Sequence, residues 1–98
     1  MQFTANLQWI KEQFGGRTHM PVAGLRPMIR IQRQVRSWLD EAVDVSVLSL
    51  GCDPETWSGE ATIKVSPNST RIFEQPQAGE LIELLDGYRV IAVGKVIR

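Results

Sequence analysis

The chain has 98 residues, of which 43% are hydrophobic and 22% charged, the composition of one globular domain with a modest core. Eleven basic side chains balance eleven acidic ones, so the net charge is zero. A neutral chain is not expected to bind RNA strongly, because such binding depends on positive charge. No apolar run could span a bilayer, no secretory signal pattern opens the chain, and Cys52 is the only cysteine. We therefore expect a cytoplasmic protein with no disulfide and no membrane partner.

The first part of the chain predicts two strands joined by a loop. Apolar and polar residues alternate over residues 2–9, which indicates a half-buried strand, and Met28 to Gln32 repeat the pattern. Between them lie two glycine corners, at residues 15–16 and 24–27, the second closed by a proline. The secondary structure of residues 34–42 is undecided. A helix would place four apolar residues on one face, but the segment is short enough to be a turn or a bulged strand; the four are Val35, Trp38, Leu39 and Ala42.

The second part of the chain predicts further strands of the same kind. Alternating residues at 43–47 and 60–65 indicate two, and residues 81–85 and 89–97 indicate two more around the hairpin signal Asp86-Gly87. Residues 51–59 read as a loop, and Ile72-Phe73 is a weaker apolar pair. Six short strands punctuated by glycine and proline favour a single all-β domain over residues 1–98, an antiparallel barrel or sandwich.

Two glycine motifs and the last hairpin resemble a known family. Gly15-Gly16-Arg17 is followed at the family's spacing by Gly24-Leu25-Arg26-Pro27, and residues 86–96 resemble its closing hairpin. The family is the third, C-terminal domain of bacterial elongation factor Tu, here as a stand-alone domain. Leu25, Tyr88, Val90 and Lys95 depart from the family pattern, and the middle of the chain, from about residue 34 to 79, is longer than in the family.

The resemblance implies a six-stranded antiparallel β-barrel whose two ends pair. It also implies fixed corners at a set of motif residues: Gly15, Gly16, Gly24, Arg26, Pro27, Gly87, Arg89 and Gly94. In full-length factors this domain grips the backbone of aminoacyl-tRNA and offers surface to the exchange factor and the GTPase domain. The chain has no Gly-x-x-x-x-Gly-Lys-Ser/Thr loop, so we expect no GTPase domain and no nucleotide.

Catalytic chemistry has little support in the residues. His19 is the only histidine, and a metal site or a catalytic triad would need partners that the spacing does not supply. Cys52 beside Asp53 could be a reactive thiol, but an inert cysteine is favoured. We expect no enzyme activity, no metal and no cofactor.

Arginines, one lysine and one tryptophan are the candidate contact residues. Arg26 and Arg89 favour a structural role, hydrogen-bonding loop carbonyls, whereas Arg17 could contact phosphates or carboxylates. Three arginines at steps of three suggest an anion-facing patch or a solvated edge, and Trp57 in a polar loop is expected to be exposed. The candidates for contact with a partner or RNA are Arg17, Arg30, Arg33, Arg36, Trp57 and Lys95.

These observations predict a non-enzymatic binding module. The expected partner is a protein of the translation machinery, with tRNA or another RNA as the second possibility. The alternative is a regulatory or immunity-type mimic that binds a toxin or enzyme directed at elongation factor Tu. Residues 37–86 carry ten acidic side chains against only Lys64 and Arg71. An exposed Trp57 with this acidic middle of the chain would favour a protein, and a continuous arginine strip would favour RNA.

Overall fold

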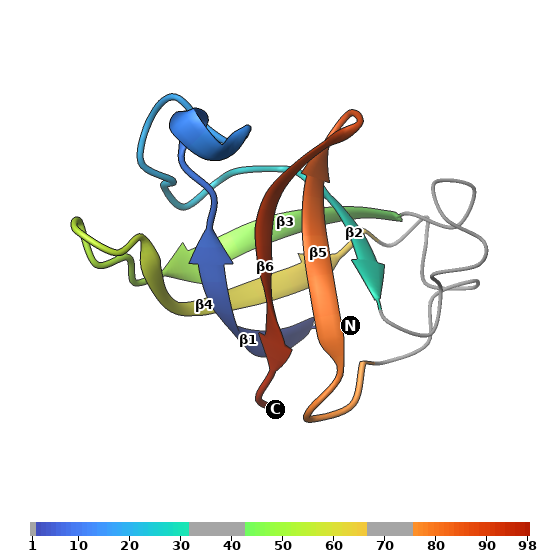
Figure 1. Cartoon of the computed structure of the whole chain (residues 1–98). Helices are drawn as coiled ribbons and strands as arrows, with labels where there is room; N and C mark the ends of the chain where they lie inside the picture. Colours follow the sequence, from blue (N-terminus) through green and yellow to red (C-terminus); the bar gives the residue numbers. More distant parts are fainter. Residues whose placement is uncertain (1, 32–42, 67–75) are drawn as a thin grey trace.

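A computed structural model describes residues 2–31, 43–66 and 76–98, and within them the chain forms a closed antiparallel β-barrel (Figure 1). The strand order around the barrel is β1-β4-β3-β2-β5-β6. The predicted six-stranded, all-β fold is confirmed, while the predictions for residues 34–42 and 72–73 lie outside the described residues. The elements are β1 (Gln2–Trp9), a 3₁₀ turn η1 (Glu12–Phe14), β2 (Met28–Ile31), β3 (Val43–Leu50), β4 (Ser58–Val65), β5 (Leu81–Asp86) and β6 (Arg89–Val96).

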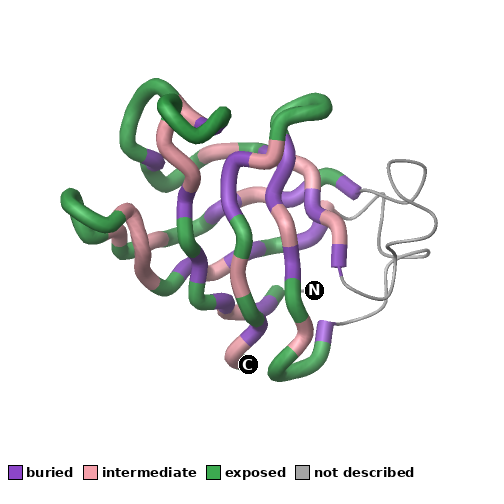
Figure 2. Tube along the Cα trace, in the orientation of Figure 1, coloured by how far each residue is buried: buried purple, intermediate pink, exposed green. Residues whose placement is uncertain are grey.

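The core fills the barrel with the inward row of each strand, as the alternating sequence predicts (Figure 2). In β1 the buried row is Phe3, Ala5, Leu7 and Trp9, so Trp9 is a core residue as expected. The other strands contribute mostly branched aliphatic side chains, which suit a pleated and half-buried surface. They include Ile29, Ile31, Val43, Val45, Val47, Ile63, Val65, Ile82, Leu84, Ile91 and Val96.

The two ends of the chain pair with each other, as the resemblance implies. β1 lies between β4 and β6, and its residues Asn6 and Leu7 face Lys95 and Gly94 of β6. Gly94 is required by this close approach, since a Cβ there would lie 2.1 Å from the backbone oxygen of Asn6. β1 itself has no charged side chain, so Lys95 of β6 is the basic residue at this pairing.

The corner at residues 24–27 continues the β2 side of the barrel. Gly24 has φ of 98° and donates its N–H to the Val47 oxygen at 2.8 Å. The oxygens of Leu25 and Pro27 accept the N–H groups of Val47 and Val45 at 2.8 and 3.0 Å. The backbone of the Gly-Leu-Arg-Pro motif thus hydrogen-bonds β3 next to β2, while Arg26 itself is exposed.

The hairpin between β5 and β6 turns at Gly87 and Tyr88, because Asp86 and Arg89 still pair. Gly87 has φ of 64° whereas Tyr88 does not enter the positive region, the pattern of a type II′ turn. Below the turn the register shifts between Leu84 and Leu85 of β5, and the extra residue is Ile91 of β6, which has no partner in the ladder. Its oxygen accepts the Ile10 N–H at 2.9 Å, which ties the start of the long loop to β6.

The strands β3 and β4 are longer than the sequence predicts. β4 begins at Ser58 rather than near residue 60, and a bulge at Leu48 lets β3 continue to Leu50. Gly59 permits this extension, since a Cβ there would lie 2.1 Å from the Gly51 oxygen. Across the described ranges the chain has no helix with the length and apolar character needed to cross a membrane.

Candidate binding surfaces

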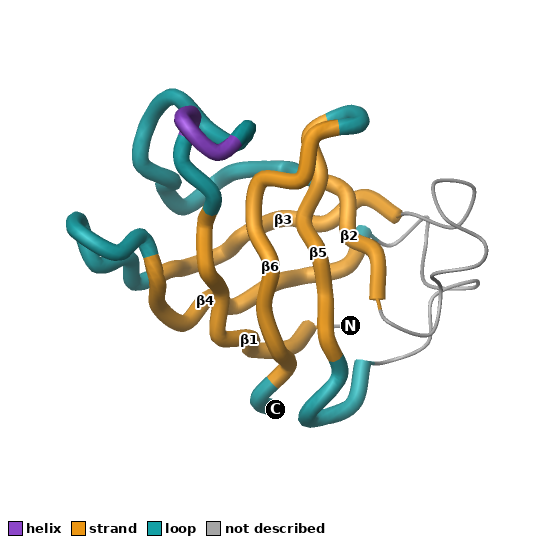
Figure 3. Tube along the Cα trace, viewed as in Figure 1, coloured by secondary structure: helices purple, strands orange, loops and turns teal. Residues whose placement is uncertain are grey.

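Three loops meet at one end of the barrel and form what we call the loop end, residues 10–27, 51–57 and 86–89 (Figure 3). Two side chains join them. Lys11 donates from Nζ to the Glu55 oxygen at 2.7 Å, and Arg89 donates from Nη1 to the Gly16 oxygen at 3.4 Å. Arg89 therefore holds a loop carbonyl, in agreement with the structural role expected for it, and it connects the two motifs that carry the family resemblance.

The turn at Gly15 and Gly16 folds the long loop back on itself. Gly15 has φ of 90° and closes the 3₁₀ turn by donating to the Glu12 oxygen at 2.9 Å. Gly16 is buried against Ile10, whose backbone oxygen would lie 1.9 Å from a Cβ at Gly16. Arg17 is half-buried and donates from Nε to the His19 oxygen at 3.1 Å. The Nε of its guanidinium is thus engaged in a hydrogen bond within the loop.

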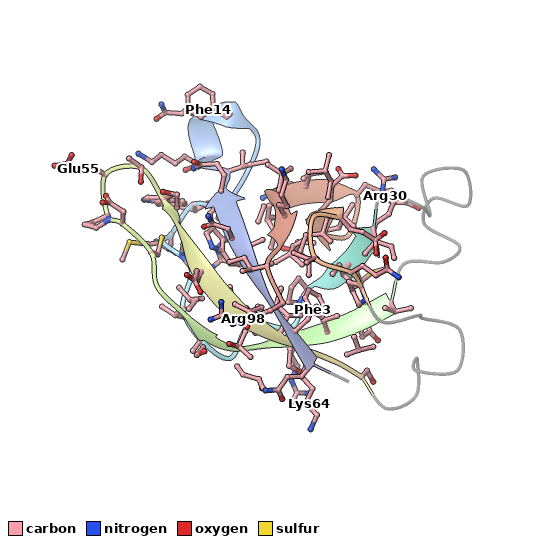
Figure 4. All side chains as sticks on the ribbon, turned by 90° about the horizontal axis from the view of Figure 1, so that it is seen from below. Phe3, Phe14, Arg30, Glu55, Lys64 and Arg98 are labelled. Carbon is pink, nitrogen blue, oxygen red and sulfur yellow. The ribbon has the colours of Figure 1, made fainter. Side chains whose placement is uncertain are left out.

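Apolar side chains project into solvent from the same loops. Phe14 in the 3₁₀ turn is 74% exposed and Tyr88 at the hairpin tip is 82% exposed, and Met20 and Val22 are exposed between them in sequence. Figure 4 contrasts Phe14, at the outer edge of the molecule, with the buried Phe3. Phe14 lies two residues before Gly16 and Tyr88 one before Arg89, so the hydrogen bond between Gly16 and Arg89 brings their two turns together.

Trp57 is less exposed than its polar loop predicts. It is half-buried and packs against the core, and Lys11 Nζ lies 5.7 Å from the ring centroid. Its φ of 58° is unusual for a bulky residue and is held by hydrogen bonds on both sides. The Trp57 N–H donates to the Asp53 oxygen at 2.7 Å, and its own oxygen accepts the Trp9 N–H at 2.8 Å. Trp57 therefore stabilises the conformation of the 51–57 loop through its backbone hydrogen bonds and its packing against the core.

Two titratable groups in the 51–57 loop have shifted pKa values. The Asp53 carboxylate accepts the N–H groups of Glu55 and Thr56 at 2.8 and 3.2 Å, and these bonds lower its pKa. Because the charged form makes the bonds, their support for the loop is present above the usual aspartate range and is lost as the pH falls through the lowered pKa. Burial, and then the Asp53 charge, raises the pKa of the Cys52 thiol.

The second candidate surface is a groove of about 870 Å³ on the outer face of the barrel, running across β4, β1, β6, β5 and β2. Its first wall is a row of facing residues, Asn6, Lys95 and Leu81, on three neighbouring strands. The next position along each strand points inward, so the backbone forms the floor there. The floor residues are Leu7, Gly94, Ile82 and Ile31.

The second wall of the groove is the next outward row, which runs from Gln8 through Val93 and Glu83 to Arg30. Arg30 pairs with Glu83 across the strands, with Nε and Nη2 at 3.0 and 2.5 Å from Oε1. Gln8 donates to the Thr56 oxygen at 2.6 Å, which links the groove to the 51–57 loop. The wall is polar at both ends and apolar at Val93.

The structure divides the predicted contact residues between these two surfaces. Arg17 and Trp57 lie at the loop end, both next to Lys11, while Arg30 and Lys95 line the groove. Arg26 is exposed on the corner at residues 24–27. Arg33 and Arg36 fall outside the described residues, so the proposed arginine strip can be followed only at Arg17, Arg30 and Lys95.

Over residues 2–31, 43–66 and 76–98, no three metal-ligating side chains gather in one place, and His19 is an exposed loop residue. Models of known protein families do not match this sequence, and no curated protein sequence matches it either. The relation to elongation factor Tu therefore remains a resemblance in the motifs.

Sequence reasoning missed the apolar members of both surfaces. Phe14 precedes the double glycine and Tyr88 follows Gly87, and an aromatic residue next to a glycine turn was a usable signal of an exposed ring. Leu81 and Val93 carry no such signal, because each sits in a strand whose apolar residues alternate imperfectly. Their outward position depends on the pairing register.

Proposed function

We propose that this chain is a binding module that docks a protein partner through its loop end, with Phe14 and Tyr88 as the apolar anchors. The observation that carries the proposal is the exposure of these two aromatic rings, 74% and 82%, on two turns joined by the Arg89–Gly16 hydrogen bond. Exposed aromatic side chains on a preorganised scaffold are typical centres of protein interfaces. Their turns are closed by Gly15 and Gly87, so little order has to be gained on binding.

The charged residues favour a protein over RNA. Arg30 is paired with Glu83, and Arg17 is hydrogen-bonded to the His19 oxygen, so each guanidinium already has a hydrogen-bond partner within the chain that a phosphate would have to compete with. The loop end carries four carboxylates, Glu12, Asp53, Glu55 and Asp86, against four cations, Lys11, Arg17, Arg26 and Arg89, so its net charge of zero offers an RNA backbone little electrostatic attraction. The resemblance to elongation factor Tu directs the search for the partner to the translation machinery and to proteins that act on that factor.

The test is affinity capture from a lysate by the tagged full chain, with and without nuclease. A protein partner should be retained after nuclease treatment and should be reduced at least about tenfold by the double variant Phe14→Ser, Tyr88→Ser, because interface anchors carry most of the binding energy. Leu48→Ser is the matched control, since Leu48 is an exposed apolar residue on the outer face of β3. It should leave capture unchanged.

Two results would overturn the proposal. Loss of the captured partner on nuclease treatment would mean that RNA mediates the contact. Equal retention by wild type and the Phe14, Tyr88 double variant, with both folded by circular dichroism, would show that the loop end is not the docking surface.

A further inference from the structure

Lys11 is bound to two separate loops of the loop end, to one through its backbone and to the other through its side chain. Its carbonyl oxygen accepts the Phe14 N–H at 2.9 Å and the Gly16 N–H at 3.0 Å, so it forms the base of the turn that carries Phe14. Its ammonium donates to the Glu55 oxygen at 2.7 Å and lies 5.7 Å from the centroid of the Trp57 ring. One residue thus supports the turn that displays an exposed aromatic ring and also holds a loop 44 residues further along the chain.

The 51–57 loop is held in a strained conformation by residues at the end of β1 and just after it. Trp57 has a φ of 58°, a left-handed conformation that is costly for a bulky residue and that persists only where surrounding contacts maintain it. The oxygens of residues 55–57 accept three hydrogen bonds from this side, from Lys11 Nζ at 2.7 Å, Gln8 Nε2 at 2.6 Å and the Trp9 N–H at 2.8 Å. Of these three donors, Gln8 and Trp9 belong to β1, whereas Lys11 belongs to the loop that carries the Phe14 turn. A change in that turn therefore reaches the 51–57 loop through Lys11.

We propose that Lys11 is a positioning residue that couples the two loops, so that a partner docking on Phe14 also holds residues 55–57 in their strained conformation. The inference rests on the loop-end proposal for the partner, while the coupling itself is a property of the free chain. Docking fixes the Lys11 backbone within the Phe14 turn, and its ammonium is then kept against the 51–57 loop. Without that ammonium the loop loses one of its three bonds to the β1 side and opens more often. Gln8 donates to the same loop and lines the groove, so its side chain reports the change.

The test perturbs the Phe14 turn in the ¹⁵N-labelled full chain and measures the 51–57 loop by NMR. Gly15→Ala strains the turn without a clash, because Gly15 has φ of 90° and no atom lies within 4 Å of a Cβ there. The amides of residues 55–57 are hydrogen-bonded to Asp53 within their own loop, so their exchange with water reports its opening. We expect this exchange to become at least about threefold faster and the side-chain amide resonances of Gln8 to shift.

Substitutions of Lys11 identify the connection. Lys11→Met keeps a long side chain but removes the charged donor, so residues 55–57 should exchange at least about threefold faster, and adding Gly15→Ala should cause no further change. Lys11→Arg keeps a cation with N–H donors and should restore the response to Gly15→Ala, which a purely packing role would not explain. Lys64→Met is the matched control and should leave the exchange unchanged. Lys64 is exposed and lies opposite Gln2, at the other end of β1, and Figure 4 shows it far from Phe14.

Three results would overturn the inference. One is unchanged exchange at residues 55–57 in either Gly15→Ala or Lys11→Met, with the variants folded by circular dichroism. Another is an equal effect of Gly15→Ala in the wild type and in Lys11→Met. The third concerns a captured partner: slower exchange at residues 55–57 that is the same in the complexes of wild type and Lys11→Met. The first two results come from the free chain, so a failed capture with the coupling intact would count against the loop-end proposal alone.

Discussion

Gly16 and Gly94 show how single residues decide the packing of this barrel. Neither glycine has a positive φ, so the backbone conformation itself does not require glycine. The requirement is space: a Cβ at Gly16 would lie 1.9 Å from the Ile10 backbone oxygen, and one at Gly94 would lie 2.1 Å from the Asn6 backbone oxygen. Gly16 thereby lets the long loop fold against the end of β1, and Gly94 lets β6 lie against it. The two glycines thus allow the long loop of the loop end and strand β6 of the groove to pack closely against β1 and the residue that follows it.

We predict that Gly94→Ala lowers the free energy of unfolding by about 2 kcal/mol or more, because the clash is with backbone and cannot be relieved by a side-chain rotation. Gly51→Ala is the matched control, since nothing lies within 4 Å of a Cβ at Gly51 and its φ is not positive. Its change should stay within about 0.5 kcal/mol. Urea denaturation followed by tryptophan fluorescence measures both, and equal stability of the two variants would contradict the close approach.

At the scale of elements, the pairing of β2 with β5 is reinforced by an outward cross-strand ion pair. Arg30 and Glu83 face each other in register, with side chains 12% and 32% exposed. A second ion pair, Arg98 with Glu60, is longer at 3.5 Å, and its side chains are 69% and 57% exposed. Water screens the second pair far more than the first, so the two pairs should differ in strength although their chemistry is the same.

A double-mutant cycle measures that difference. With alanine at Arg30 and Glu83, separately and together, we expect a coupling free energy of about 1 kcal/mol that shrinks in high salt. The same cycle at Arg98 and Glu60 should give a coupling close to zero. A coupling at Arg30–Glu83 no larger than that of the exposed pair would mean that the strand pairing does not depend on it.

The strands could be predicted from the sequence because their inward residues alternate, and β1 is the clearest case. The irregular positions could not. Consecutive buried residues such as Leu84 and Leu85 follow from a bulge, and a bulge depends on the register with a neighbouring strand. The partner of Arg30 was missed for the same reason, because Glu83 lies 53 residues away and only the strand order brings it alongside. Trp57 was misjudged because its polar neighbours conceal its packing against the core.

For the whole molecule, closure of the barrel separates the two candidate surfaces. The loop end gathers turns from three parts of the chain at one end, and the ends of the chain lie toward the other (Figure 1). The groove crosses the side where β1 and β6 pair. A partner could therefore occupy the loop end while leaving the groove exposed, and each surface can be altered by surface substitutions that do not reach the core.

The central claim is that a protein docks on the loop end, and hydrogen–deuterium exchange of the full chain with and without its captured partner tests it most directly. We predict slower exchange in the complex at residues 10–19 and 86–89, with strand β4 unchanged. The same measurement with Phe14→Ser, Tyr88→Ser should show no such slowing at equal concentrations. Slower exchange confined to the β3 and β4 face, with residues 10–19 and 86–89 unaffected, would contradict the claim.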